Sequence, residues 1–115
     1  MTQFVFSYRV TPEYVARADA DALAAWNSFF TDVLADNVVD PGKPVFEPST
    51  VLGEVGPATR LGGYSIVSAD DLETALAMAK QCPIIGAGGG VEVGVLADLP
   101  PEHPAEQLRA RLANA

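Results

Sequence analysis

The chain has 115 residues, and 49% of them are hydrophobic, which is enough for one two-layer core, so residues 1–115 are expected to form a single domain. Fifteen acidic residues against seven basic ones give a formal net charge of −8. This charge repels phosphate backbones and anionic lipid surfaces, so neither a nucleic acid nor a membrane is expected as a partner.

The first two expected elements are a strand and a helix. Apolar residues occupy every second position of a strand at 4–10: Phe4, Phe6, Tyr8 and Val10. A helix is expected to begin near Asp19 or Asp21, because apolar residues then recur at steps of three and four. Its core-facing stripe comprises Leu23, Trp26, Phe30, Val33 and Leu34.

A loop and two strands are expected in the middle of the chain. Three prolines and one glycine predict a loop at 37–48. The β-propensity of the following residues predicts a second strand at 49–55, although Gly53 weakens it. A third strand is expected at 61–67, with Tyr64 and Ile66 on one face.

The last third of the chain predicts a helix, a strand and a short final helix. Ser68 and Asp71 approximate a capping box at the start of the second helix, and Pro83 is expected to end that helix. Its core side is expected to contain Leu72, Ala75, Leu76, Ala79 and Cys82. Alternating valines predict a fourth strand at 91–95, and a helix is expected at about 104–112.

These elements follow one another as β, α, β, β, α, β, with an additional C-terminal helix. Right-handed crossovers fold two such halves into a ferredoxin-like α+β sheet with both helices on one face. The expected spatial order is fourth, first, third, second strand. The other face is left bare and mostly apolar, which is unstable in water. A second copy of the chain is the simplest cover, so a homodimer is expected.

The segment 61–96 resembles the YCII-related (DGPF-type) family of small bacterial proteins. The resemblance rests on Gly63-Tyr64-Ser65-Ile66, the Ala-rich second helix, Lys80-Gln81-Cys82-Pro83 and Gly90-Val91-Glu92-Val93. The run Val39-Asp40-Pro41-Gly42-Lys43-Pro44 is also similar to the loop after the first helix in one branch of the family. The resemblance implies a ferredoxin-like subunit that dimerises sheet to sheet as a dimeric α-β barrel. It names no reaction.

Two departures from the family pattern bear on catalysis. Some members carry a histidine on the first helix, and Trp26 occupies that position here. The Asp-Gly-Pro-Phe signature is reduced to Gly56-Pro57, with Val55 in place of the aspartate and Ala58 in place of the phenylalanine. This chain therefore lacks the groups on which such catalysis would depend.

Other features restrict cofactors and location. Cys82 is the only cysteine, so no intramolecular disulfide forms, and no Cys/His cluster has metal-ligand spacing. The first residues lack the pattern of a secretory signal, and no run of about 18 apolar residues exists. A cytoplasmic protein with neither a cofactor nor a metal is expected.

Polar residues on the bare sheet face are the main candidates for a ligand site. The alternation is expected to bring Ser7, Arg9, Ser65 and Glu92 together in a cleft between two subunits. Arg9 can hold a carboxylate bidentately, and Glu92 can act as a base when desolvated. The alternative is an Arg9–Glu92 cross-strand ion pair that fastens the dimer.

Four other features have two interpretations each. Trp26 and Tyr64 are either core or pocket residues, and Asp40 is either a turn former or a pocket acid. His103 is either a general base or a surface residue of the proline-rich tail. The glycine run 86–90 could cradle an anion, but it follows a helix and precedes a strand, the reverse of a dinucleotide fingerprint, which favours a flexible connection.

Two functions from different classes remain open. The first is an enzyme or binding protein that handles a small organic acid in the dimer cleft. Glu92 is then the catalytic candidate, and the ligand-binding candidates are Ser7, Arg9, Trp26, Asp40 and Ser65. The second is a non-catalytic dimeric module that regulates or scaffolds another protein. A cavity lined by Arg9, Ser65 and Glu92 favours the first function, and a dry interface with these residues paired to each other favours the second.

Overall fold

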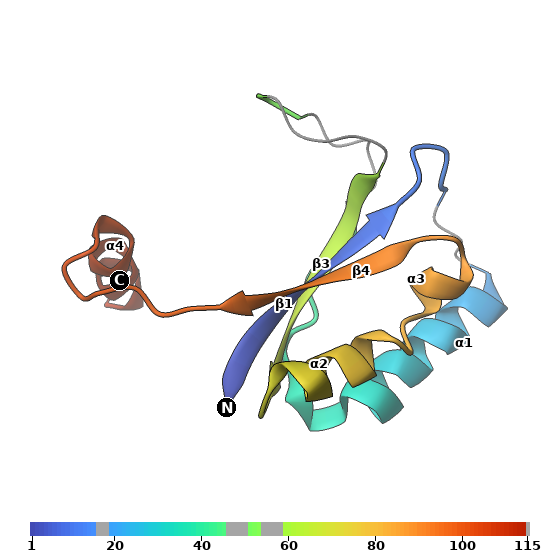
Figure 1. Cartoon of the computed structure of the whole chain (residues 1–115), viewed down its shortest axis with the longest axis horizontal. Coiled ribbons are helices and arrows are strands. Elements are labelled where there is room, and N and C mark those ends of the chain that lie inside the picture. Colours follow the sequence, from blue (N-terminus) through green and yellow to red (C-terminus); the bar gives the residue numbers. More distant parts are fainter. Residues whose placement is uncertain (16–18, 46–50, 54–58, 115) are drawn as a thin grey trace.

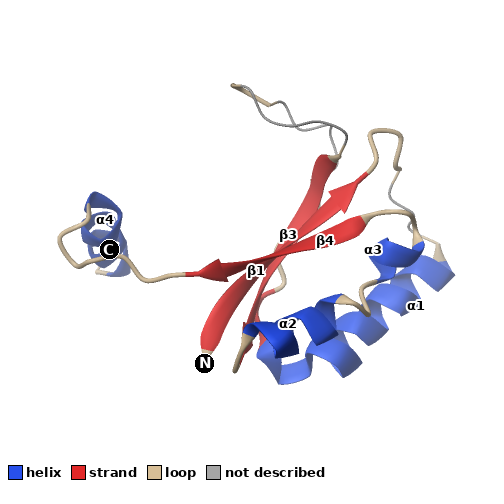
Figure 2. Cartoon of the chain, in the orientation of Figure 1, coloured by secondary structure: helices blue, strands red, loops and turns tan. Residues whose placement is uncertain are grey.

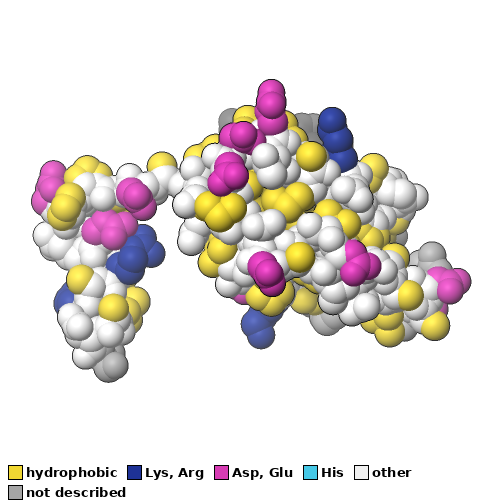
Figure 3. Space-filling model, turned by 90° about the horizontal axis from the view of Figure 1, so that it is seen from below, with side chains coloured by type: hydrophobic (Ala, Val, Ile, Leu, Met, Phe, Trp, Pro, Cys, Tyr) yellow, Lys and Arg dark blue, Asp and Glu magenta, His cyan; other side chains and the backbone are white. Residues whose placement is uncertain are grey.

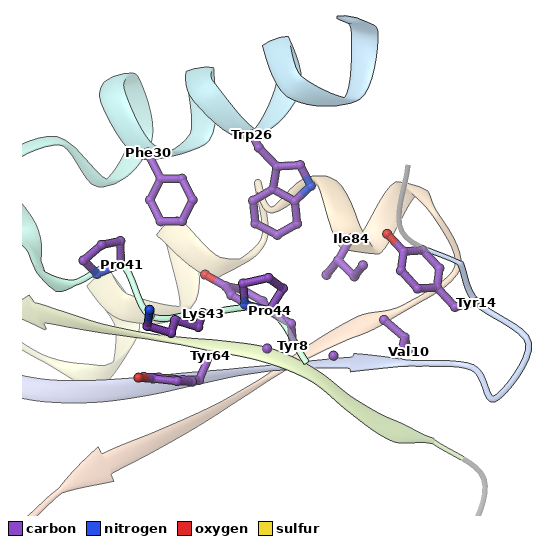
Figure 4. Close-up of a pocket in the computed structure, with 13 residues that line it drawn as sticks. Tyr8, Val10, Tyr14, Trp26, Phe30, Pro41, Lys43, Pro44, Tyr64 and Ile84 are labelled. Carbon is purple, nitrogen blue, oxygen red and sulfur yellow. The ribbon is translucent and has the colours of Figure 1, made fainter. Parts of the chain in front are cut away.

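The computed structural model describes residues 1–15, 19–45, 51–53 and 59–114. These residues form a four-stranded antiparallel sheet with helices α1, α2 and α3 on one face, while helix α4 stands apart (Figures 1 and 2). The protein therefore has an α+β fold. The face of the sheet opposite the three helices is not covered by any described element (Figure 4).

The strands lie in the order β2-β3-β1-β4. The central strand β1 (Thr2–Val10) pairs with β3 (Arg60–Ala69) on one side and with β4 (Gly90–Leu96) on the other. The short β2 (Val38–Asp40) pairs with β3 at the edge. The expected apolar alternation in β1 is confirmed, because the four apolar side chains are buried against the helices: Phe4, Phe6, Tyr8 and Val10.

The second strand comes from other residues than predicted. The prediction placed it at 49–55, but residues 51–53 are not in a strand, and the rest of that range lies outside the described residues. The strand is formed instead by Val38–Asp40, inside the predicted loop. Two consecutive β-branched valines explain this choice, because they fit the edge of the sheet beside Ile66 and Val67.

Helix α1 (Ala20–Ser28) begins where predicted. The Asp19 side chain caps it by accepting a hydrogen bond of 2.9 Å from the Ala22 amide. The helix continues as a π-helical segment, Phe29–Leu34, whose wider turn lets both end residues face the sheet and become buried. Trp26, Phe30 and Val33 pack partly buried against the core as expected, but Leu23 is 59% exposed, so its prediction as a core residue is wrong.

Helix α2 (Leu72–Ala79) is capped by Asp71 alone. The Asp71 carboxylate accepts bonds of 2.8 Å from the Thr74 amide and 2.7 Å from the Thr74 hydroxyl, and these bonds lower its pKa. The predicted capping box is wrong, because Ser68 belongs to β3 and its hydroxyl donates to the Asn37 carbonyl. The cap is therefore the aspartate next to the first helical residue.

The core side of α2 consists of small residues and one methionine. Ala75, Met78, Ala79 and Cys82 are buried as a set. Leu72 and Leu76 are exposed, which contradicts their prediction as core residues. The alanines let the helix approach the sheet closely, and the flexible Met78 side chain fills the remaining space. Leu72 and Leu76 therefore lie outside the buried side of the helix.

Pro83 lies beyond the end of α2, as predicted, and opens the short helix α3 (Pro83–Gly86). In the glycine run after it, Gly89 serves close packing. A Cβ atom at Gly89 would lie 2.5 Å from the Arg9 carbonyl oxygen and 2.9 Å from Ile84. The connection into β4 therefore requires glycine at that point.

The C-terminal helix α4 (Pro104–Ala113) agrees with the prediction for 104–112. His103 is its N-cap, and the ring Nδ1 accepts a hydrogen bond of 3.0 Å from the Ala105 amide. This assigns His103 to the exposed tail. Across the described ranges, the structure has no helix whose length and apolar character would allow it to cross a bilayer.

Candidate functional site

A cavity of about 290 Å³ lies between α1 and the sheet (Figure 4). Trp26 and Phe30 point into it from α1 and its π-helical continuation, and Ile84 reaches it from α3. Tyr8 and Val10 of β1 form its floor. The loop at 41–44, which follows β2, lies along the remaining side. Most of the surface is therefore aromatic or aliphatic, with few polar groups.

The aromatic rings around the cavity form a connected cluster. The Trp26 ring meets Tyr8 edge-on with centroids 5.3 Å apart, and it stacks on Phe30 at 6.0 Å. Phe29 lies behind, 5.9 Å from Trp26. These contacts hold the indole in place while one side of it still faces the cavity. Trp26 is thus both a core residue and a pocket residue.

A chain of two hydrogen bonds lies under the cavity. The Tyr8 hydroxyl donates to Ser65 Oγ at 2.8 Å, and the Ser65 hydroxyl donates to the Pro41 carbonyl at 2.7 Å. Ser65 is fully buried. Desolvation raises the pKa of Tyr8 to about 12, although the bond with Ser65 opposes that rise. The Tyr8 phenol is therefore protonated at neutral pH and acts as a donor.

The loop at 40–44 is fixed by a turn and by close packing. Asp40 Oδ1 accepts a hydrogen bond of 2.8 Å from the Gly42 amide, which makes Asp40 a turn former and not an acid of the pocket. Gly42 has φ +74°, and a Cβ atom there would overlap the Tyr64 carbonyl oxygen. Only glycine allows the loop to lie this close to β3.

Lys43 supplies the positive charge of the pocket. It is exposed, lines the cavity, and has no carboxylate within ion-pair distance in the described part of the chain. No aspartate or glutamate is among the described residues that line the cavity. The electrostatic character of the pocket is therefore opposite to the net charge of −8 of the whole chain.

Tyr14 closes the end of the cavity next to Val10. The Arg60 guanidinium holds this segment through a bond of 2.6 Å from Nη2 to the Tyr14 carbonyl. A second hollow of about 220 Å³ adjoins the cavity and shares Tyr14, Trp26 and Ile84 with it. These three side chains therefore form the partition between two neighbouring spaces.

The residues expected in a subunit cleft do not all share a face. Ser7 and Glu92 pair across β1 and β4 on the uncovered face, as predicted. Ser65 lies on the helix-covered side, which contradicts the prediction. It pairs with buried Phe6, and paired residues share a face. Tyr64, which pairs with Ser7, occupies the uncovered face instead and points away from the cavity (Figure 4).

The Arg9 guanidinium binds Thr59 and not Glu92. Its Nε and Nη2 atoms donate to the side chain and carbonyl of Thr59, both at 3.2 Å. The described residues include no Arg9–Glu92 ion pair. Glu92 is exposed, so a single subunit provides it with no desolvated environment.

Tyr8, Tyr14 and Lys43 were missed as pocket residues by the sequence analysis. Tyr8 was assigned to the core by its place in an apolar alternation, which is correct but incomplete. Lys43 stands between Gly42 and Pro44 in a loop with restricted backbone, and a lone lysine in such a rigid loop is the signal that could have identified it.

Metal and thiol chemistry receive no support from the described residues. They contain no group of three or more His, Cys, Asp or Glu side chains placed to hold a metal ion. Burial raises the pKa of the Cys82 thiol to about 11, so the reactive thiolate is scarce at neutral pH. Cys82 is a packing residue.

The fold and the cavity define the class of protein. It is a small α+β protein with an aromatic pocket between one helix and an antiparallel sheet. No protein-family model, curated protein or solved structure matches the chain. Its function is therefore inferred from the chemistry of the pocket.

Proposed function

We propose that this protein binds a small carboxylic acid with a single ring in the cavity beneath α1. The observation that carries the proposal is an aromatic cavity with one unpaired lysine and no carboxylate among its described lining residues. The ring lies between the aromatic side chains, and the carboxylate lies at Lys43. This is the small organic acid expected from the sequence, in a different place.

The size and surface of the cavity support a single-ring ligand. A volume of about 290 Å³ is at the small end of ligand pockets, which span roughly 300–1,000 Å³. Trp26 and Phe30 present aromatic surface, and Ile84 presents aliphatic surface. A flat apolar group displaces water from all three, which provides most of the binding free energy.

The charge of the cavity supports an acid. Lys43 attracts an anion without competition from an ion-pair partner in the described residues. The protonated Tyr8 phenol adds a neutral environment that carries no repelling charge. A cationic ligand would lack a counter-charge among the described lining residues.

The proposed activity is binding. Tyr8 is protonated at neutral pH, so it is no general base for a ligand in this cavity. Glu92, the catalytic candidate of the sequence analysis, lies on the other face of the sheet and does not reach this ligand. In this proposal Trp26 contacts the ligand, and Ser65 supports the site from the helix-covered side of the sheet by binding Tyr8 and the Pro41 carbonyl.

The proposed assembly is a homodimer of ferredoxin-like, YCII-related subunits. The strand order β2-β3-β1-β4 and the three helices on one face support it. The uncovered face includes Val5 beside Ile66, and a second copy shields such apolar groups from water. In this dimer Ser7, Arg9 and Glu92 are residues of the subunit contact.

Fluorescence tests the binding proposal directly, because Trp26 is the only tryptophan. We expect phenylacetate and cyclohexanecarboxylate to change the emission of Trp26 saturably. Replacing Lys43 by Gln should weaken phenylacetate binding about tenfold, since about 1.4 kcal/mol of charge attraction is lost. Binding of neutral phenylacetamide should be unchanged.

Lys80 provides a matched control, because it is an exposed lysine at the end of α2 that does not line the cavity. Lys80→Gln removes the same charge and should leave phenylacetate binding unchanged. Phenyl phosphate shows whether the lysine accepts any anion or prefers a carboxylate. Equal losses in the two lysine variants, or no saturable response to any acid, would contradict the proposal.

A further inference from the structure

The C-terminal segment 97–114 makes its hydrogen bonds only within itself. Gln107 bonds to the Glu102 carbonyl, and Arg109 forms two bonds of 3.0 Å to the Glu106 carboxylate, while the His103 cap closes the first turn of α4. Glu106 is its only described residue that is not exposed. In Figure 3 the segment forms a separate lobe joined to the body by a narrow neck.

A helix of this kind requires a partner. Isolated helices shorter than about 12–15 residues are marginal in water, and α4 has 10 residues. Leu108 and Leu112 lie one helical turn apart on the same side, and they are 47% and 66% exposed. The segment therefore presents an apolar strip that its own subunit does not cover.

The uncovered sheet face presents a complementary surface. Across its centre Val5 stands between Ile66 of β3 and Gly94 of β4. Gly94 has no side chain beside Val5, so the surface is lower there than at its neighbours. Leu96, at the end of β4, is exposed next to this row. The face thus has an apolar centre with a shallow depression.

We infer that α4 of each subunit crosses to a second copy of the chain and packs its leucine strip on the uncovered sheet face of that copy. Leu108 and Leu112 then cover the row formed by Val5, Ile66 and Gly94. The inference rests on the homodimer proposed above and specifies which segment completes it.

The direction and stiffness of the linker favour a second copy over the subunit's own sheet. Strand β4 leads straight out of the sheet into the segment, so α4 lies beyond the end of the strand (Figure 1). Pro100, Pro101 and Pro104 restrict the backbone of the connection. Folding back would require a sharp reversal within this proline-rich stretch.

Charge favours a contact between α4 and the acidic body of a chain. Helix α4 contains Glu106, Arg109 and Arg111 and contributes +1 to the net charge of −8, which leaves −9 on the rest of the chain. A slightly basic helix is attracted to an acidic body, whereas two acidic bodies repel each other. Exchange of the helices therefore reduces the electrostatic cost of dimerisation.

Sedimentation of the full-length chain tests the exchange. We expect the wild type to be a dimer and the double variant Leu108→Glu/Leu112→Glu to dissociate about 100-fold more readily, because four buried leucines are lost per dimer. Leu23→Glu is the matched control, since Leu23 is an exposed leucine of α1 outside the proposed contact, and it should leave the dimer intact.

Disulfide trapping identifies the subunit that receives the helix. In a Cys82→Ala background, chains with Leu112→Cys are mixed with isotope-labelled chains with Ile66→Cys. We expect mixed disulfide dimers on oxidation. A chain carrying both cysteines that closes an internal disulfide as a monomer would overturn the exchange.

The outcomes separate this inference from the proposals on which it rests. A double glutamate variant that stays fully dimeric overturns the helix exchange and leaves the homodimer standing. A monomeric wild type overturns both. Titration of Trp26 fluorescence with phenylacetate, carried out on the same variants, reports separately on the pocket.

Discussion

At the scale of single residues, Ser65 connects three segments that are distant in sequence. It accepts a hydrogen bond from Tyr8 on β1 and donates one to Pro41 in the loop after β2, while its own backbone belongs to β3. Its burial makes both bonds costly to lose. The Ser65 hydroxyl therefore connects Tyr8, on the floor of the cavity, with the loop at 41–44 along its side.

The Ser65 and Tyr8 hydroxyls should contribute differently to the free energy of unfolding. We expect Ser65→Ala to lower the free energy of unfolding by about 1–3 kcal/mol, because the Pro41 carbonyl and the Tyr8 hydroxyl both lose their partner. Tyr8→Phe should cost only about 1 kcal/mol, since Ser65 still donates to Pro41. Urea unfolding measures both, and a larger loss for Tyr8→Phe would contradict the central role of Ser65.

The raised pKa of Tyr8 predicts how stability depends on pH. Burial raises this pKa from 10.0 to about 12, so the protonated phenol makes its full contribution to the free energy of unfolding below pH 10. This contribution is lost as the pH rises from 10 to 12, by up to about 3 kcal/mol. Denaturant unfolding across this range should show a steeper decline for the wild type than for Tyr8→Phe. Parallel curves would show that Tyr8 is not responsible.

The candidate site was only partly predictable at this scale. Of the predicted ligand-binding candidates Trp26, Asp40 and Ser65, only Trp26 lines the cavity. Asp40 forms the turn of the adjoining loop, and Ser65 lies on the face opposite to the one predicted. The face on which Ser65 lies was not predictable from the pattern, because both faces of β3 have an apolar residue. Val67 shares a face with Ser65, and Ile66 shares the other face with Tyr64. Register with β1 decides between them, and register depends on long-range pairing.

At the scale of elements, the helices were more predictable than the strands. Their starts follow from local capping by Asp19 and Asp71, although the sequence also favoured Ser68 for the second cap. The buried sides of both helices were predicted incompletely, because a π-helical segment changes the periodicity after Ser28 and alanines replace leucines as the packed residues of α2. The edge strand β2 has three residues, too few for a pattern.

The loop at 40–44 is the element whose integrity the pocket needs most. Gly42→Ala should displace the loop, because the backbone has φ +74° and the new methyl group would overlap the Tyr64 carbonyl. We expect a loss of phenylacetate binding along with reduced stability. Trp26 fluorescence and urea unfolding measure the two effects.

Gly88→Ala is the matched control for this change. Gly88 has φ +89°, and no atom lies within 4 Å of the position that the new methyl group would occupy, so only backbone strain of about 1–2 kcal/mol is expected. Ligand binding should persist in this variant. Equal binding by the two alanine variants would show that the loop does not shape the pocket.

At the scale of the whole molecule, two surfaces have different roles. The helix-covered side of the sheet encloses a cavity within one chain, while the other side and α4 are left without a partner among the described residues of that chain. The proposed ligand binding and the proposed assembly therefore depend on opposite faces of the same strands. Residues of β1 alternate between them, with Tyr8 at the cavity and Ser7 on the uncovered face.

Nuclear magnetic resonance of the labelled protein tests the location of the ligand most directly. The single indole resonance of Trp26 and the amide of Lys43 should shift saturably as phenylacetate is added, because both residues line the cavity. The amides of Ser7 and Glu92, which pair with each other on the uncovered face and do not line the cavity, should shift little. Shifts confined to those two residues would place the acid on the uncovered face and contradict binding in the cavity beneath α1.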